Sequence, residues 1–343
     1  MKSPKQTLGS MKTWLRHLKY KCPRLEVLSQ HRQSLIIKGE YPPPSTVDSP
    51  IVISLHNNVF HSGGLCDRLR AMCATYQICK EQGLEYKIAH FVPFNLRDFL
   101  EPNAVDWYIS ESDIIWDTRL VEILYWEPIP RKFTRRKTWD EYHNFNFNQF
   151  RKELSNVRNK KQIHVYHNLQ CIRMEKVNGL FHELFRPTEE LRRAIEWNKK
   201  QIGGKYVSVT ARFQNLIGDF YEGDFKTLET EGEKRDYLQR CIRKVEEIHL
   251  RYPDMKVLVT SDSSRFLEEA GRLPYVHVNP GKVVHMQFTT DAAHEVYLKS
   301  FVDLFTIADA EKVHQLATGR MYIGGFPITA ASINSRPYEL IKF

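Results

Sequence analysis

The segment IVISLHNNVFHSGGLCDRLRAMCATYQICKEQGLEYKIAHFV, residues 51–92, decides the fold of this chain. It opens with a short apolar run rich in β-branched residues at 51–55, which predicts a buried strand. A glycine turn follows, then a mainly apolar helical stretch over 69–80 and a second strand over 86–92. Strand, helix and strand in this order indicate a parallel α/β unit.

A similar alternation returns from about residue 200. Strands are predicted at 206–210, 256–260, 275–278 and 321–323, and helices at 234–251, 265–272, 299–316 and from about 328. This second half is expected to be a doubly wound sheet whose ligand lies beyond the carboxyl ends of the strands. The predicted organisation is a basic helix and linker (1–45), an N-terminal α/β domain (46–200) with an irregular aromatic stretch at 93–150, and a C-terminal α/β domain (201–343).

Composition and charge narrow the class of protein. The 343 residues exceed what one hydrophobic core usually organises, so two domains are expected. The net charge of +9 suits an anionic partner, which could be a nucleotide, a nucleic acid, an acidic glycan or a lipid headgroup. Six cysteines without CxxC spacing predict free buried thiols in a reducing compartment.

The N-terminal segment bears on location. It has no apolar core of a signal peptide, and no run approaches 18 apolar residues, so a cytoplasmic protein is expected. Residues 11–20 predict a short helix with Trp14 and leucines on one face and basic residues off it. Such a helix could contact an anionic membrane peripherally, at its inner face, or pack on the protein itself.

Polar residues follow the predicted strands of the second half. Arg212 comes directly after the strand at 206–210, and a guanidinium binds phosphate oxygens with two N–H donors. A salt bridge at the start of a loop would explain the same arginine. Asp262 follows the strand at 256–260 and either caps the next helix or faces a ligand. Gly324-Gly325 precede Pro327, which suits a tight turn into a helix whose free N–H groups attract anions.

The glycine turn of the first segment could also approach an anion. Gly63-Gly64 permit positive φ and close backbone approach, and Arg68 adds charge. The turn is neither a Walker loop nor a GxGxxG motif. No DxD pair occurs anywhere, so a nucleotide-sugar enzyme would neutralise its diphosphate with arginines and helix dipoles rather than with a metal. Residues 163–167 are a candidate for a further strand. In a strand the spacing His164-x-x-His167 points the two side chains to opposite faces, so it predicts no zinc site.

These segments together resemble the GT-B fucosyltransferase superfamily, which includes nodulation-type and core α-1,6-fucosyltransferases, protein O-fucosyltransferases and related bacterial polysaccharide enzymes. Residues 63–70 look like its GGLGxRL turn, with Cys66 where a glycine is usual. Residues 209–212 look like its HxR motif, with Thr210 in place of the histidine. Residues 259–262 resemble the second motif, and 303–309 and 324–331 resemble the two ends of the third, where Gly325 and Pro327 replace the usual serines.

The resemblance implies a fold and a set of roles. Two Rossmann-like domains would face each other across a cleft, with residues 46–200 on the acceptor side and residues 201–343 binding the nucleotide-sugar. The donor would be a GDP-sugar, GDP-fucose above all, with no cofactor. Arg212 would hold the β-phosphate and stabilise the leaving diphosphate, and Asp303 would read the guanine. From its place near the polar edge of an amphipathic helix alone, Asp303 is expected to be a solvated carboxylate. The other residues implied in donor binding are Gly63, Gly64, Asp67, Arg68, Thr210, Asp262, Gly325, Phe326 and Thr329.

The expected reaction is transfer of a hexosyl group, fucose in the first place, to a glycan or a lipid-linked polysaccharide. Asp219, Glu222 and Asp224 follow Arg212 in a loop, and one of them could accept the acceptor's proton. One alternative is a non-catalytic protein that binds nucleic acid or an acidic polymer, favoured by the basic cluster at 131–137. A sulfotransferase is another, although Ser62-Gly63-Gly64 fits a phosphosulfate loop poorly.

Overall fold

The computed structural model describes residues 50–57, 63–126, 129, 134, 136, 138–157, 160–167, 172–221, 225–284 and 292–343. They form two compact units, each assembled from separate parts of the chain. Unit 1 comprises the described residues within 1–62, 74–91 and 107–171. Unit 2 comprises those within 63–73, 92–106 and 172–343. The helix expected at 11–20 and most of the basic cluster at 131–137 lie outside the described residues.

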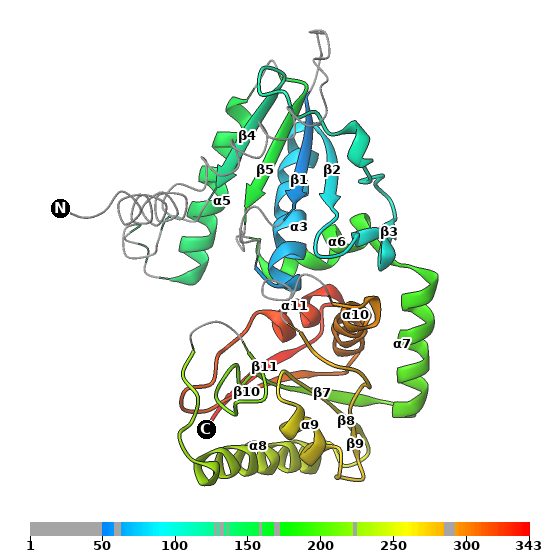
Figure 1. The fold of residues 1–343 in the computed structure, drawn as a ribbon, viewed down its shortest axis with the longest axis vertical. Helices are drawn as coiled ribbons and strands as arrows, with labels where there is room; N and C mark the ends of the chain where they lie inside the picture. The colour runs from blue at the N-terminus through cyan, green and yellow to red at the C-terminus, as the bar shows by residue number, and fades with distance from the viewer. Residues whose placement is uncertain are drawn as a thin grey trace, which may run out of the picture. The chain divides into compact units, whose positions relative to one another are not determined.

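Unit 1 is built on a parallel sheet of four strands in the order β2-β1-β5-β4 (Figure 1). The strands are β1 (Ile51–His56), β2 (Glu85–His90), β4 (Val121–Trp126) and β5 (Gln162–His167). The prediction of the first two strands and of the strand at 163–167 is confirmed. Helix α3 (Leu65–Gln82) connects β1 to β2, and its first half, 65–73, belongs to unit 2.

Residues 93–150 are more regular than the sequence indicates. They contain β4 and the long helix α5 (Trp139–Asn156). The sequence of α5 mixes aromatic, asparagine and charged residues, so no aliphatic stripe reveals it. Its start is nevertheless encoded, because Thr138 accepts a hydrogen bond from the Glu141 N–H at 3.2 Å and the Glu141 carboxylate accepts one from the Thr138 N–H at 3.3 Å.

Unit 2 is built on a five-stranded parallel sheet in the order β11-β10-β7-β8-β9. The strands are β7 (Tyr206–Ala211), β8 (Lys256–Ser261), β9 (Val276–His277), β10 (Val313–Ala317) and β11 (Tyr338–Lys342). Helices α8 (Glu231–Arg251) and α9 (Ser264–Ala270) lie on one face of this sheet, and α10 (His294–Ala308) and α11 (Phe326–Ile333) lie on the other (Figure 1). The expected doubly wound sheet is confirmed.

Two predicted elements near the C-terminus are wrong. The helix expected at 299–316 ends at Ala308, and a turn through Asp309 leads into strand β10. Buried His314 and Gln315 break the apolar run of this strand, so its sequence does not read as a core strand. The strand expected at 321–323 does not form, and Tyr322 and Ile323 are instead exposed.

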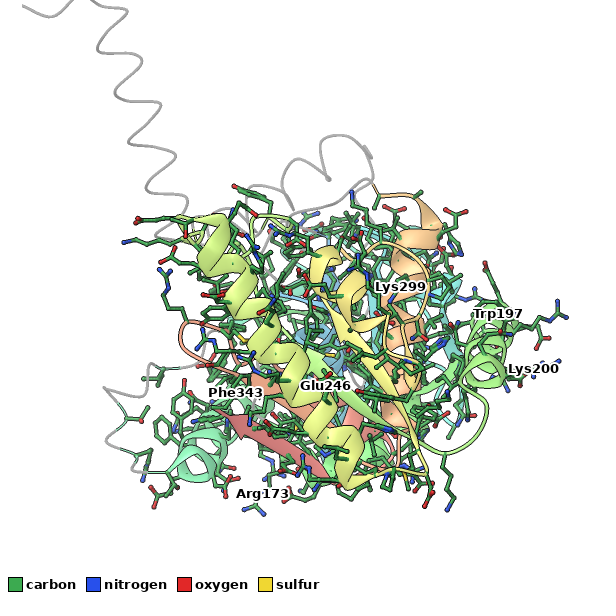
Figure 2. The ribbon with its side chains drawn as sticks, turned by 90° about the horizontal axis from the view of Figure 1, so that it is seen from below. Arg173, Trp197, Lys200, Glu246, Lys299 and Phe343 are labelled. Carbon is green, nitrogen blue, oxygen red and sulfur yellow. The ribbon has the colours of Figure 1, made fainter. Side chains whose placement is uncertain are left out.

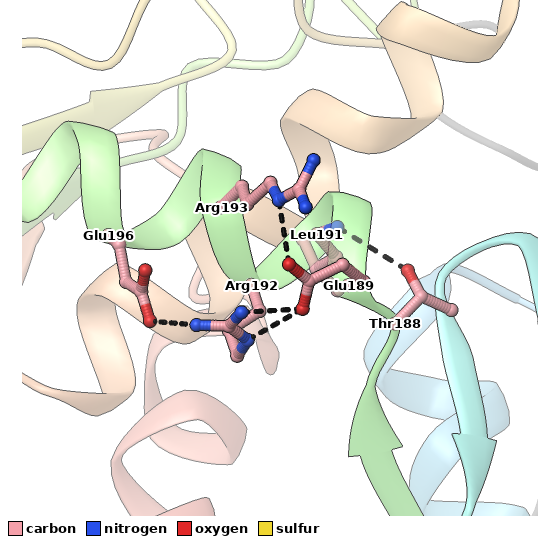
Figure 3. Close-up of polar contacts among 6 residues, drawn as sticks. All are labelled: Thr188, Glu189, Leu191, Arg192, Arg193 and Glu196. Atoms are coloured by element: carbon pink, nitrogen blue, oxygen red, sulfur yellow. Dashed lines mark hydrogen bonds and ion pairs between the residues drawn. The ribbon is translucent and has the colours of Figure 1, made fainter.

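Unit 2 also contains elements that the sequence did not predict. They are α6 (Met174–Leu184), α7 (Glu189–Ile202), strand β11, and a small antiparallel pair of β3 (Leu100–Pro102) with β6 (Phe185–Pro187). Thr188 caps α7, and Arg192 bridges Glu189 and Glu196 on its exposed face (Figure 3). Trp197 and Lys200 project outward from the same helix (Figure 2).

The described cysteines, Cys66, Cys73, Cys79 and Cys241, are all free and buried, as predicted. Cys22 and Cys171 lie outside the described residues. Among the helices of the described ranges, none combines the length and the apolar character needed to cross a bilayer.

A turn after β10 makes a test of local packing. Gly319 has φ +54°, and a Cβ there would lie 2.4 Å from the Tyr237 hydroxyl oxygen, which bonds the Thr318 carbonyl and the Arg320 N–H. Gly319→Ala should lower the free energy of unfolding by about 1–3 kcal/mol. The matched control is Gly179→Ala in α6, where nothing lies within 4 Å of the added methyl. It should raise stability by about 0.5–1 kcal/mol. Equal denaturation midpoints for Gly319→Ala and the wild type would contradict this packing.

Unit 1 should be sensitive to acid through His167. Its ring is buried, bonds the Thr75 hydroxyl at 2.7 Å, and burial lowers its pKa to about 3. The unfolded chain takes up this proton near pH 6.5 and the folded chain only near pH 3. The free energy of unfolding should therefore fall by about 1.4 kcal/mol per pH unit as the pH drops from 6.5 towards 3. His167→Gln should lose that part of the slope in denaturation curves measured at several pH values, and an unchanged slope would refute the assignment.

Candidate functional site

The site lies where the order of the unit 2 sheet reverses. Strand β7 is followed on one side by β8 and β9, and on its other side by β10 and β11. Ligands of open α/β sheets bind beyond the carboxyl ends of the two strands at such a point. Arg212 directly follows β7, and the segment 318–325 follows β10 and leads into α11.

The Gly63-Gly64 turn begins helix α3. Gly63 has φ +71°, which favours glycine, and the Gly64 N–H donates to the Asp67 carboxylate at 3.1 Å. Arg68 is only 1% exposed and donates to the carbonyls of Gly63 and Val92, each at 3.2 Å. Burial lowers its pKa to about 10, so it remains charged at neutral pH. Asp67 and Arg68 thus brace the turn from within.

Arg70 was not predicted as a site residue, yet it reaches the second glycine turn. Its Nη2 donates to the Asp67 carboxylate at 2.7 Å, and its Nε donates to the Cys66 carbonyl at 3.3 Å. The same Nη2 lies 2.7 Å from where a Cβ on Gly325 would be. The available signal was the spacing of Asp67 and Arg70, which places the pair on one helix face.

Arg212 reaches the neighbouring glycine. A Cβ on Gly324 would lie 3.2 Å from Cδ of Arg212 and 3.7 Å from its Nη1. The guanidinium carbon lies 5.2 Å from the centre of the Tyr322 ring, in a cation–π contact. Two adjacent glycines therefore leave room for two arginine side chains, Arg70 and Arg212.

Helix α11 starts at this turn. Its N-cap is Gly325, which has no side chain to cap the first N–H groups, and Pro327 occupies the first turn as predicted. The Thr329 hydroxyl donates to the Gly325 carbonyl at 2.7 Å, and the Cys66 thiol lies 3.8 Å from the Phe326 carbonyl. Two guanidinium groups and the positive end of a helix dipole thus converge, an arrangement suited to a diphosphate.

Asp262, one of the residues implied in donor binding, bonds the backbone beside Arg212. Its carboxylate accepts hydrogen bonds from the N–H groups of Phe213 and Gln214, both at 2.8 Å, and so holds the turn directly after Arg212. Burial raises its pKa to about 6, against the opposing effect of those N–H groups and of Arg212. Ser263, rather than Asp262, caps α9.

Two further predicted residues make structural contacts. Asp219 Oδ2 accepts hydrogen bonds from the Ser263 hydroxyl at 2.8 Å and from the Arg265 N–H at 2.9 Å, which ties its loop to the start of α9. The Thr210 hydroxyl pairs with that of Thr260 at 2.8 Å between β7 and β8. Glu222 and Asp224 lie outside the described residues.

Asp303 is not at a solvated polar edge, as its place in an amphipathic helix suggested. It is 5% exposed in α10, accepts a hydrogen bond from the Asn279 amide at 2.8 Å and forms a buried ion pair with Lys299. Figure 2 marks Lys299 on this helix. The expectation of a solvated carboxylate is therefore wrong, because Lys299 lies one turn earlier on the same helix face.

A separate groove of about 410 Å³ lies along α8 and α9. Its lining residues are Arg235, Gln239, Ile242, Arg243, Glu269 and Arg272. None of the predicted site residues lines this groove. The candidate site is therefore placed at the glycine turns, where the charges converge, and not in this groove.

No family model matches the sequence, and no curated protein matches it either. Solved structures do match. The α-1,6-fucosyltransferase NodZ soaked with GDP-fucose has a TM-score of 0.52 and 14% identity, over 86% of this chain and 95% of that one. Fucosyltransferase NodZ from Bradyrhizobium gives 0.50 and 16%, over 84% and 92%.

A plant structure matches over a longer part of this chain. FUT1 of Arabidopsis thaliana, solved as a mutant in complex with GDP, has a TM-score of 0.50 and 9% identity, over 94% of this chain and 76% of that one. At these identities the likeness concerns the fold. The chain therefore has a GT-B fold like that of these fucosyltransferases, as the sequence resemblance implies.

Proposed function

We propose that this chain is a glycosyltransferase that moves a sugar, fucose in the first place, from a GDP-sugar to a glycan or lipid-linked polysaccharide acceptor without a metal ion. The observation that carries the proposal is the convergence of Arg70, Arg212 and the start of α11 on Gly324-Gly325, at the point where the unit 2 sheet reverses. NodZ and FUT1, which share the fold, were solved with GDP-fucose and GDP respectively, and this supports a GDP-linked donor.

The chemistry requires positive charge at this position. In the transfer, the bond between the sugar's anomeric carbon and the β-phosphate oxygen breaks, and its electron pair stays on the diphosphate. Negative charge on the diphosphate therefore grows towards the transition state. The groups that would bind this charge are Arg212, Arg70 and the N–H groups of α11. They would bind the diphosphate more tightly in the transition state than in the ground state, which is the condition for a faster step.

The positions of these groups are set in advance. Asp262 fixes the turn after Arg212, and Asp67 holds Arg70 through an ion pair at 2.7 Å. Each carboxylate holds a group that lies beside the proposed diphosphate site. The two guanidinium groups therefore need little reorganisation when the donor binds. In this proposal Asp67 and Asp262 position the site rather than contact the donor.

The remaining roles are also proposals. The acceptor's hydroxyl proton would pass to Asp219 or Glu222. In Asp219, Oδ2 is already bonded and Oδ1 has no hydrogen-bond partner among the described residues. Asp303 would read the guanine base, in competition with its ion pair to Lys299. No cofactor is part of the proposed reaction, and peripheral contact with an anionic membrane would use residues 11–20.

Arg212→Ala should lower the rate of GDP release from GDP-fucose by about 10²–10³-fold, because it removes one charge donor from the leaving diphosphate. The fold should be retained, as judged by circular dichroism. The control is Arg192→Ala, since Arg192 is paired with Glu189 and Glu196 on the exposed face of α7 (Figure 3). Near wild-type turnover in Arg212→Ala would overturn the proposed role.

The donor class is tested separately by thermal shift with GDP, UDP, CMP and adenosine 3′,5′-bisphosphate. A ligand present at 100 times its Kd should add about 2.7 kcal/mol of stability. GDP is expected to give the largest shift. Stabilisation by UDP without any by GDP would refute the GDP-sugar assignment.

Gly325→Ala should weaken GDP binding about tenfold, which is about 1.4 kcal/mol. The added Cβ would lie 2.7 Å from Nη2 of Arg70 and would displace that guanidinium. The backbone at Gly325 has φ −79°, so alanine causes no conformational strain there and the melting temperature should hardly change. Calorimetric titration with GDP measures the effect, with Gly179→Ala as the control. Unaltered GDP affinity in Gly325→Ala would contradict the proposal that Arg70 binds the donor.

A further inference from the structure

We propose that Gln315 is a positioning residue of the diphosphate site, which acts by holding the backbone of Gly324 in place. Gln315 lies in the middle of strand β10 and is fully buried. The identity of the anion as a diphosphate rests on the proposed function. The hold on Gly324 rests on the hydrogen bonds of the Gln315 side chain and on the place of Gly324 beside Arg212.

The side-chain amide of Gln315 pairs with both backbone groups of Gly324. Its oxygen accepts a hydrogen bond from the Gly324 N–H at 2.9 Å, and its nitrogen donates to the Gly324 carbonyl at 3.3 Å. The same nitrogen donates its second hydrogen to the Tyr338 hydroxyl of strand β11 at 2.6 Å. Two bonds to the backbone of one residue restrain both its position and its direction, so Gly324 is held by the sheet itself.

Only one orientation of this amide satisfies its surroundings. In the reverse orientation the Tyr338 hydroxyl could still donate to the Gln315 oxygen at 2.6 Å. That orientation would, however, place the amide oxygen against the Gly324 carbonyl and the amide nitrogen against the Gly324 N–H. Two acceptors and two donors would then face each other inside the protein, which is unfavourable for buried polar groups. The amide therefore takes the orientation that pairs with Gly324.

This pairing accounts for a glutamine in a central strand. Strand β10 lies between β7 and β11 (Figure 1), and such strands are usually continuous apolar runs. The next residue, Leu316, belongs to a hydrophobic cluster with Leu238 of α8, so Gln315 points to the opposite face of the sheet, which α10 and α11 cover. A buried amide destabilises the fold unless it is hydrogen-bonded, and the bonds to Gly324 meet that requirement.

The position of Gly324 matters because two parts of the site adjoin it. The Cβ position of Gly324 lies 3.2 Å from Cδ of Arg212, so this side chain packs directly on the glycine. The following residue, Gly325, is the N-cap of α11. A shift of the Gly324 backbone would therefore move the support of the Arg212 guanidinium and the first N–H groups of the helix together. Gln315 thus acts on the diphosphate through these groups and not by contact with it.

The test measures the affinities of the full chain for GDP and for GMP by calorimetric titration. Gln315→Met keeps the length and nearly the volume of the side chain but cannot pair with Gly324. Tyr338→Phe is the matched control, because it removes only the third bond of the same amide. Val245→Ala, in the core beneath α8, is a control for a general loss of stability. Circular dichroism and melting temperatures without nucleotide report on the fold.

GMP lacks the β-phosphate, so the two nucleotides separate the hold on the diphosphate from the integrity of the fold. The wild type should bind GDP more tightly than GMP by about tenfold. Gln315→Met should bind GDP about fivefold more weakly than the wild type and GMP within about twofold of it. Tyr338→Phe and Val245→Ala should keep the wild-type ratio of the two affinities, even where the melting temperature falls.

Unchanged GDP affinity in Gln315→Met, or an equal loss of GDP and GMP affinity, would overturn the role of Gln315 and leave the proposed function standing. A wild type that binds neither nucleotide, or binds GDP no more tightly than GMP, would refute the diphosphate site and the role of Gln315 with it. If Gln315→Met does not fold, Gln315→Asn takes its place with the same expected outcomes, because its amide is one methylene too short to pair with Gly324.

Discussion

The site depends on the absence of side chains at two adjacent positions. Gly324 and Gly325 occupy the turn between β10 and α11, and an arginine side chain lies against each position where a Cβ would stand, at 3.2 Å for Gly324 and 2.7 Å for Gly325. Like-charged guanidinium groups repel one another, so bringing Arg70 and Arg212 close to the same turn costs free energy unless anions offset it. Asp67 offsets part of this cost at Arg70 and Asp262 part of it at Arg212. A bound diphosphate would supply the rest.

This constraint explains why the two glycine turns belong to one structure although they are about 260 residues apart. The first half of α3 packs within unit 2, so the turn at 63–64 and the turn at 324–325 share their surroundings. The Cys66 thiol faces the Phe326 carbonyl, and Arg70 faces Gly325. In sequence these look like two separate anion-binding turns, whereas in space the side chains of one fill the room left by the other.

Much of the fold follows from the sequence because buried parallel strands are continuous apolar runs. Strands β1, β7 and β8 are of this kind, and their ends also locate Arg212 and Asp262. Strand β10 was not predicted, because His314 and Gln315 lie in its middle. Both residues are buried by tertiary contacts, which the local sequence pattern does not show. Helix α5 was not predicted, because its sequence mixes aromatic residues with asparagine and charged residues and shows no aliphatic stripe.

The places of Arg212 and of the two glycine turns could be predicted, because each lies where a buried strand ends or a helix begins. The contacts of the carboxylates could not. A carboxylate can cap, brace or pair, and only the fold decides: Asp67 caps, Asp262 braces a turn, and Asp303 pairs with Lys299. The sequence could not tell whether Arg68 or Arg70 lies beside the Gly324-Gly325 turn. The answer depends on which side of α3 is covered by the rest of unit 2.

The thiol of Cys66, which follows the Gly63-Gly64 turn, has one more consequence. Burial raises the pKa of all four described thiols, at Cys66, Cys73, Cys79 and Cys241. Alkylating reagents and peroxide react with thiolates, so these four sulfurs are chemically protected for as long as the chain stays folded. Their labelling rate therefore measures how often the structure opens locally, and Cys66 reports that opening beside the Gly63-Gly64 turn.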